Sequence, residues 1–418
     1  MKRLGFIVFF VGALISFAGE GANPPGHLPS AATVAAREAM QRMDFSLAAE
    51  RLVAGVAARD PDALMLQGVL HALGAGTYYD HTLATDYWRQ AANAGQREAV
   101  RLLLPWLNDS HAREWWQERA KTFPAPAVTV PENLVRTERG RVFTEKEVAK
   151  KWIIRESERG NAVGLYNAYE AAQFGARNSE QAKARVRKLL ERAAELRLPV
   201  AMRELSSEFE QSLPVAPVIN LGFPKDLVAA AKWMREAAEM GDGRAELLWG
   251  HWLSSGRAGQ KDLAAAVDFY RRASAQGIDH ATYFLYSAYT SGEGVEKDEQ
   301  KAGDYLRLAA EQGNDLAVGN YAYQLFYGRG MPADPAAAIA MLEPMLACSL
   351  VPNSGSIDLV AFAYATGKGV EKNIAKAQWW GRWAIERGSK YAPGLMASLT
   401  AEMQEPSEKK QADSTESK

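Results

Sequence analysis

One turn sequence returns along the second half of the chain at a nearly constant interval, and this repetition limits the folds that the chain can adopt. The turn has two glycines, and an Asp or Asn follows six residues after the first, as in SGEGVEKD at 291–298. Four first glycines stand 36, 36 and 39 residues apart: Gly256, Gly292, Gly328 and Gly367. A weaker copy runs from Gly74 to Asp80. Such a period indicates stacked helical repeats.

The residues around each turn predict two helices joined by a corner. Small and aromatic residues recur at helical spacing after the turn, as in Ala302, Tyr305 and Ala309. The acid or amide before them is a good helix N-cap, and a glycine suits the left-handed end of a helix. We therefore interpret these residues as structural turns and caps: Gly256, Asp262, Gly292, Gly294, Asp298, Gly328, Asp334, Gly367 and Asn373. The alternative, a phosphate-binding loop, would require a preceding strand and a fuller glycine or Lys-Ser/Thr signature, and both are missing.

This pattern resembles the Sel-one-like repeat, a branch of the tetratricopeptide superfamily. Residues 279–313 match best, through Ala281, Leu285, Tyr289, Gly292, Gly294, Val295, Asp298, Ala302, Tyr305, Ala309, Ala310 and Gly313. The resemblance is strong over 225–388, moderate over 60–95 and degenerate over 147–202. It implies an all-α fold, a right-handed α-solenoid of helix pairs that binds other proteins.

Composition shifts divide the chain into segments. We expect N-terminal helical repeats over 31–121, degenerate repeats over 144–210 and Sel-one-like repeats over 225–400. Between them lie a Pro-rich stretch, interpreted as a linker or long loop, over 122–143, and an irregular insertion over 211–224. The tail at 405–418 lacks apolar residues, so we expect it to be disordered.

The first residues predict export. Lys2 and Arg3 precede an apolar run from Leu4 to Phe17, which is too short to span a bilayer. We expect a signal peptide over 1–18, cleaved near Ala18, and a periplasmic protein. An uncleaved anchor is the alternative. Peripheral membrane association is left open.

Charge and residue types argue against several functions. The 49 basic and 50 acidic residues leave a net charge near zero, whereas a nucleic-acid-binding domain would usually be basic. The single cysteine, Cys348, excludes an internal disulfide. We expect no catalytic group, no metal and no cofactor. Asp109, Ser110 and His111 are neighbours in the sequence, but we interpret them as a helix cap, and we interpret 379–383, WWGRW, as repeat-closing core.

Aromatic residues on the first helix of each repeat are the remaining signal. Tyr283 and Tyr286 are three residues apart and share a helical face, off the inward stripe of the same helix. Stacked repeats would align such rings into a ladder on the concave face, although they could instead pack between repeats. The candidate protein-binding residues are Tyr166, Tyr169, His251, Trp252, Tyr283, Tyr286, Tyr323, Phe326 and Phe362.

The leading hypothesis is therefore a non-enzymatic, periplasmic protein-interaction module. Signal-bearing members of the family resemble immunity proteins encoded beside secreted phospholipase effectors, so one expected partner is a secreted toxin or effector. A scaffold or regulator in envelope polysaccharide export or signalling is the alternative. A cell-wall or β-lactam hydrolase is disfavoured, because the catalytic groupings and the paired cysteines of β-lactam-linked relatives are absent from the sequence.

Overall fold

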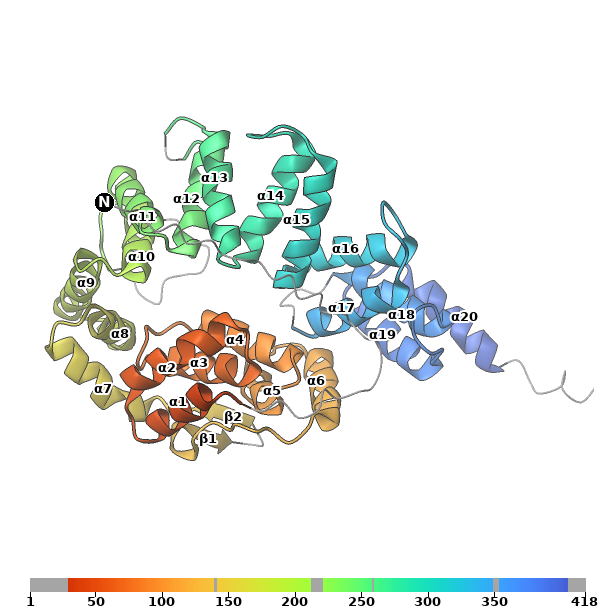
Figure 1. Ribbon diagram of the computed structural model, residues 1–418, viewed down its shortest axis with the longest axis horizontal. Helices are drawn as coiled ribbons and strands as arrows, with labels where there is room; N and C mark the ends of the chain where they lie inside the picture. The colour runs from red at the N-terminus through yellow and green to blue at the C-terminus, as the bar shows by residue number, and fades with distance from the viewer. Residues whose placement is uncertain (1–28, 139–140, 212–220, 258, 349–352, 405–418) are drawn as a thin grey trace, which may run out of the picture.

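Alanine-rich segments bounded by N-caps and glycine turns form a series of helix pairs (Figure 1). The computed structural model describes residues 29–138, 141–211, 221–257, 259–348 and 353–404. The expected signal peptide, the tail at 405–418 and most of the insertion at 211–224 lie outside these residues. Within them the chain is an all-α solenoid with one short β-hairpin.

The helices follow one another in three groups. The first contains α1 (Ala31–Gln41), α2 (Phe45–Ala57), α3 (Pro61–Leu73), α4 (His81–Asn93), α5 (Arg97–Leu103) and α6 (Ser110–Thr122). The second contains α7 (Glu147–Glu158), α8 (Ala162–Gln173), α9 (Glu180–Glu195) and α10 (Pro199–Glu210). The third contains α11 (Leu227–Glu239), α12 (Gly243–Ser255), α13 (Leu263–Ala275), α14 (Asp279–Ser291), α15 (Glu299–Gln312), α16 (Asp315–Tyr327), α17 (Pro335–Cys348), α18 (Ser354–Thr366), α19 (Ile374–Glu386) and α20 (Ala392–Gln404).

The recurring turn residues cap these helices. The side chains of Asp262, Asp298, Asp334 and Asn373 each accept a hydrogen bond from a first-turn amide of the helix that follows. Gly256, Gly292, Gly328 and Gly367 end the first helices with φ between 68° and 78°. The second glycine serves close packing in more than one turn, because a Cβ would lie 2.4 Å from the carbonyl oxygen of Leu263 at Gly294 and 2.5 Å from the carbonyl carbon of Pro335 at Gly369. The SGEGVEKD turn is thus a corner between two helices.

The Pro-rich segment at 122–143 is more ordered than a linker. Strands β1 (Val135–Glu138) and β2 (Arg141–Thr144) pair antiparallel, with Val135 opposite Thr144. Val128, Val130, Leu134 and Val142 are buried in the N-terminal core. The segment therefore covers the first helix pairs, and burial of these apolar side chains explains why it is not a free loop.

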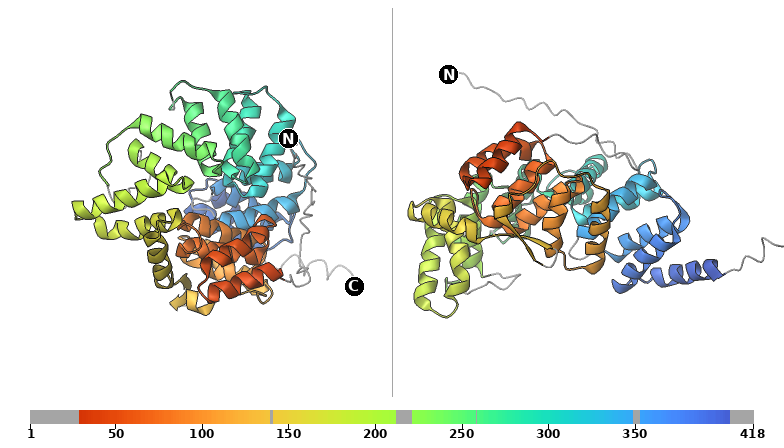
Figure 2. Two further views of the ribbon diagram at one scale, coloured as in Figure 1. Left: turned by 60° about the vertical axis from the view of Figure 1, so that its left-hand side comes forward. Right: turned by 90° about the horizontal axis from the view of Figure 1, so that it is seen from below.

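The solenoid curves until its two ends meet. Figures 1 and 2 show α17 and α19 lying near α6, and α6 packs directly against α17. Asp109 is the N-cap of α6 and also accepts a hydrogen bond of 3.1 Å from Nε1 of Trp383, and it pairs with Arg387. His111 stacks on Trp383, with ring centres 5.5 Å apart. We call this contact the end clasp.

The end clasp joins the helix cap at 109–111 to the WWGRW segment at 379–383. Asp109 and His111 do belong to a helix cap, and Trp383 does lie in the core with an exposed fraction of 0%. The structure adds that the cap and the WWGRW segment contact each other across 274 residues of sequence.

Candidate functional site

The first helices of four successive repeats share one exposed face. Leu248 on α12 and Phe284 on α14 are one repeat period of 36 residues apart, and His251 on α12 and Tyr323 on α16 are two periods apart. Tyr327 lies one helical turn beyond Tyr323 on α16. Tyr323 and Tyr327 are 41% and 44% exposed, and Leu248 and Phe284 are each more than a third exposed. The half-buried Tyr283, Tyr286 and Phe362 lie beside them. We call these eight residues the first-helix strip.

Side-chain contacts link the neighbouring helices that carry the first-helix strip. The ring centres of His251 and Phe284 are 6.1 Å apart, which joins α12 to α14. Nδ2 of Asn320 donates a hydrogen bond of 3.4 Å to the hydroxyl of Tyr283, which joins α16 to α14. Phe362 on α18 contacts the buried Phe326 of α16, with ring centres 6.3 Å apart. Exposed aromatic rings in such a row are favoured anchors for a protein partner.

Four of the nine candidate binding residues are buried rather than exposed. Tyr166, Tyr169 and Trp252 are at most 4% exposed and belong to the core around α8–α12, and Phe326 has an exposed fraction of 0%. The expectation that these four rings lie on a surface is wrong, since one residue along a helix turns a side chain by about 100°. His251, Tyr283, Tyr286, Tyr323 and Phe362 lie on the first-helix strip. Their role in binding stays a prediction.

The sequence interpretation missed Leu248, Phe284 and Tyr327. The repeat register contains the signal for two of them, because Gly256 and Gly292 are 36 residues apart and so are Leu248 and Phe284. An alignment of the repeats on their first glycines would have placed Leu248 and Phe284 at the same position. Tyr327 directly precedes the glycine turn, where helix ends are hard to assign from sequence alone.

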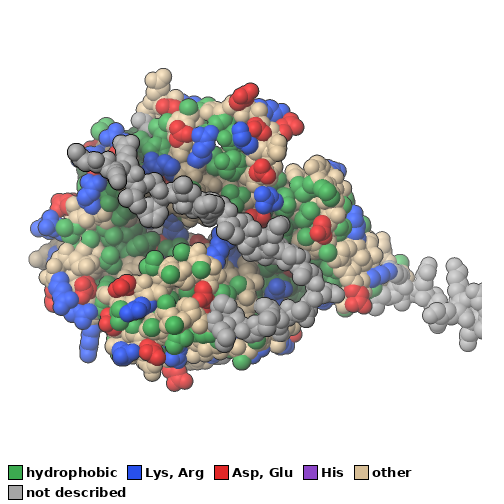
Figure 3. Space-filling view, in the orientation of Figure 1, with side chains coloured by type: hydrophobic (Ala, Val, Ile, Leu, Met, Phe, Trp, Pro, Cys, Tyr) green, Lys and Arg blue, Asp and Glu red, His purple; other side chains and the backbone are tan. Residues whose placement is uncertain are grey.

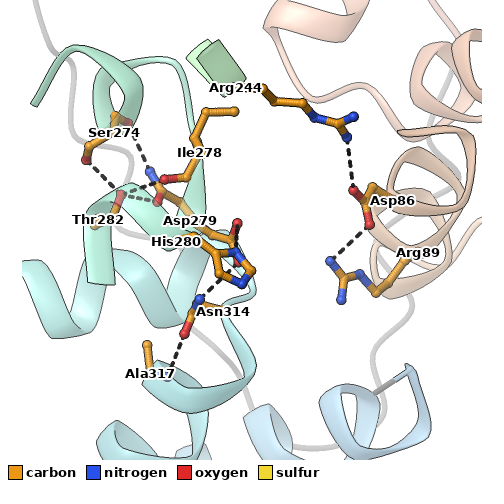
Figure 4. A network of polar contacts seen from close by, with 11 residues as sticks. Asp86, Arg89, Arg244, Ser274, Ile278, Asp279, His280, Thr282, Asn314 and Ala317 are labelled. Carbon is orange, nitrogen blue, oxygen red and sulfur yellow. Dashed lines mark hydrogen bonds and ion pairs between the residues drawn. The ribbon is translucent and has the colours of Figure 1, made fainter. Parts of the chain in front are cut away.

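A polar network crosses the gap between the first repeat and the later ones (Figure 4). Nη1 of Arg244, on α12, is 2.7 Å from Oδ2 of Asp80, and its Nη2 is 3.8 Å from Oδ2 of Asp86. Burial raises the pKa of Asp86, although Arg89 and Arg244 oppose the shift. On the facing α14, Asp279 accepts a hydrogen bond of 3.2 Å from Nδ2 of Asn314. Arg244 therefore ties the first repeat to repeats distant in sequence.

Three glutamates lie close together between α8 and α10. Burial, followed by the charge of Glu204, raises the pKa of Glu170 and of Glu208 to about 7. Burial also raises the pKa of Glu204, which accepts a hydrogen bond of 3.4 Å from the hydroxyl of Tyr169. A pKa near 7 for Glu170 and Glu208 leads us to expect that the stability of this region depends on pH in the neutral range.

Among the titratable side chains of the described residues, His71 is buried in the core. Burial lowers the pKa of His71 to about 4, and its Nδ1 is 3.0 Å from the carbonyl oxygen of Tyr78, as expected of a core histidine. In the described part of the chain, no group of three or more His, Cys, Asp or Glu side chains is placed to bind a metal ion. No helix within the same residues has the length and hydrophobicity to cross a membrane.

Comparison with known proteins identifies the class. A model of the Sel1 repeat matches residues 61–96, 200–242, 243–278, 281–314, 316–345 and 358–389, which together make up half of the chain. The chain therefore belongs to the Sel1 repeat family, whose repeats generally mediate protein–protein interaction.

Two solved structures resemble the chain. One is a Sel1 repeat protein from Oxalobacter formigenes, with 22% identity, a TM-score of 0.43, and coverage of 59% of this chain and 91% of that one. The other is c5321, described as a protective antigen of uropathogenic Escherichia coli with an SLR fold. It has 19% identity, a TM-score of 0.45, and coverage of 88% and 72%. Among curated proteins, none matches.

Proposed function

We propose that this chain is a non-enzymatic interaction module of the bacterial periplasm that binds another protein along the first-helix strip. The observation that carries the proposal is the set of exposed aromatic side chains on α12, α14 and α16, whose helices are linked by side-chain contacts. A monomeric protein usually buries such rings, whereas binding surfaces are enriched in them. Membership of a family of interaction repeats supports the same conclusion.

Location and partner are the finer part of the proposal. The basic residues and short apolar run at the N-terminus support export to the periplasm. There the module would neutralise a secreted antibacterial effector as an immunity protein. If the neighbouring genes encode polysaccharide export proteins instead of a secreted effector, the scaffold role replaces the immunity role.

Site-directed photo-crosslinking in the source bacterium tests the interaction. A photoreactive amino acid replaces Tyr323 on the first-helix strip, and in a matched variant it replaces Asp304, which is 66% exposed on α15. We expect a discrete protein adduct from position 323 and none from position 304. Equal labelling from both positions, or none from either, would contradict binding along the strip.

A further inference from the structure

In three turns, the residue after the first glycine is a cation that lies against an aromatic ring of a first helix. The guanidinium carbon of Arg257 is 5.2 Å from the ring centre of Trp252, and that of Arg329 is 4.9 Å from the ring centre of Tyr323. Nζ of Lys368 is 4.5 Å from the ring centre of Phe326. The turn is therefore more than a corner, because in three repeats it holds a cation over an aromatic ring, and two of these cations, Arg329 and Lys368, lie over rings of the first-helix strip.

Two of these cations are available to a ligand. Arg257 is paired with Glu210, so its charge is already neutralised. By contrast, Arg329 and Lys368 form no ion pair with any described residue. Both lie close to the exposed ring of Tyr327, at 5.9 Å and 5.0 Å from its centre, so the two charges are at most about 11 Å apart. They belong to one site, which we call the Tyr327 patch: Tyr323, Tyr327, Arg329 and Lys368.

We propose that the Tyr327 patch binds an extended acidic segment of the partner protein, which deepens the proposed function and rests on it. In an extended segment, alternate side chains point to the same side and lie about 7 Å apart. Two carboxylates at alternate positions therefore fit within the spacing of Arg329 and Lys368. The apolar or aliphatic parts of the segment would cover the exposed rings of Tyr323 and Tyr327.

The charge pattern favours an acidic peptide over a nucleic acid. Single-stranded nucleic acid is bound by aromatic rings along a continuous basic groove. Here the corresponding turn of the neighbouring repeat carries Glu293 in place of a cation, and the chain as a whole has a formal net charge of −1. Figure 3 shows basic and acidic side chains interspersed over the face in view. Two cations suit a short acidic segment better than a polyanion.

Fluorescence anisotropy tests this specificity on the full chain. The probe is a labelled ten-residue peptide of alternating glutamate and valine, compared with the same peptide carrying glutamine. We expect the glutamate peptide to bind at least tenfold more tightly, and its affinity to fall as salt is added. The double variant Arg329→Gln/Lys368→Gln should lose that preference. The matched control Arg185→Gln/Lys188→Gln removes one arginine and one lysine from the exposed surface of α9, and should bind like the parent.

A charge reversal keeps the test independent of any effect on folding. Arg329→Glu/Lys368→Glu should prefer a lysine–valine peptide over the glutamate peptide. Equal binding of the glutamate and glutamine peptides, or an unchanged affinity in the Gln double variant, would overturn the inference. Tighter binding of a ten-nucleotide DNA strand would overturn it also. Adducts from position 323 combined with no acidic preference would remove this inference alone, whereas absence of adducts would remove the proposed function as well.

Discussion

The end clasp makes two segments far apart in sequence depend on one carboxylate. Asp109→Ala removes three interactions: the cap of α6, the acceptor for the buried Trp383 and the pairing with Arg387. Loss of a cap costs about 1 kcal/mol. A buried donor without an acceptor costs ~1–3 kcal/mol, and a partly exposed ion pair at most about 1 kcal/mol. Since the partly exposed ion pair adds little, the expected destabilisation of the contact between α6 and α19 is about 2–4 kcal/mol.

Hydrogen exchange followed by mass spectrometry measures this loss where it occurs. Solenoids open locally, and exchange reports the free energy of each local opening. A loss of ~2–4 kcal/mol should accelerate exchange roughly 30- to 900-fold wherever the clasp limits opening. We expect faster exchange in both α6 and α19. The control Asp262→Ala removes a helix cap that accepts a single amide hydrogen bond, so its effect should stay within α13.

The reasoning would be refuted by an unchanged exchange rate in α19 of Asp109→Ala. Such a result would mean that the two ends of the solenoid do not support each other in solution. A matching effect from Trp383→Phe, which deletes the donor but keeps an aromatic ring, would show that the hydrogen bond itself carries the coupling. Burial raises the pKa of Asp109, but bonds from Arg387, the Ala112 amide and Trp383 hold it below its usual value overall. The clasp should therefore weaken as pH falls through that lowered pKa.

Three further predictions follow from single features. In denaturant unfolding, Gly294→Ala should destabilise the chain by ~1–3 kcal/mol more than Gly330→Ala. The two glycines share a φ near 75°, but of the two only Gly294 lies where a Cβ would meet backbone atoms. Equal losses of stability would contradict the packing argument. Glu170→Gln and Glu208→Gln should each raise the free energy of unfolding by about 1–2 kcal/mol at pH 8 and by little at pH 4.5. The reason is that a carboxyl group with a raised pKa in the folded state lowers stability above pH 4.5, and most above pH 7. A gain in stability that does not vary with pH would contradict this reasoning. Mass spectrometry of protein from the source organism should find a mature terminus near Ala18, and an intact Met1 terminus would exclude the proposed export.

Local signals determine most of the fold, and they are readable in the sequence. A residue such as Asp298 caps a helix, and Gly292 ends one, through contacts with neighbours a few residues away. Because these signals recur with the repeat period, the same pair of helices is predicted in each repeat. The β-hairpin at 135–144 was missed because its strands have four residues each, too few for a clear alternation.

Contacts across long sequence distances could not be predicted. The end clasp exists because small rotations between successive repeats add up until α19 meets α6. The total rotation cannot be read from any pattern of residues in the sequence. The exposure of the aromatic side chains was predictable in part. Tyr323 is exposed as expected, but Trp252 and its neighbour His251 were expected to be alike, although only His251 points outward.

Binding by the first-helix strip is the central claim, and one affinity measurement tests it most directly. The partner captured from position 323 is titrated against the parent, against Tyr323→Ala/Tyr327→Ala, and against the control Leu227→Ala/Val228→Ala, which truncates exposed apolar side chains on α11. Truncating hot-spot aromatics costs at least ~2 kcal/mol, so we predict roughly thirtyfold weaker binding for the tyrosine variant. We expect near-parental affinity for the control and near-parental melting for both. Parental affinity in a folded tyrosine variant would contradict the claim, because the partner would then bind elsewhere.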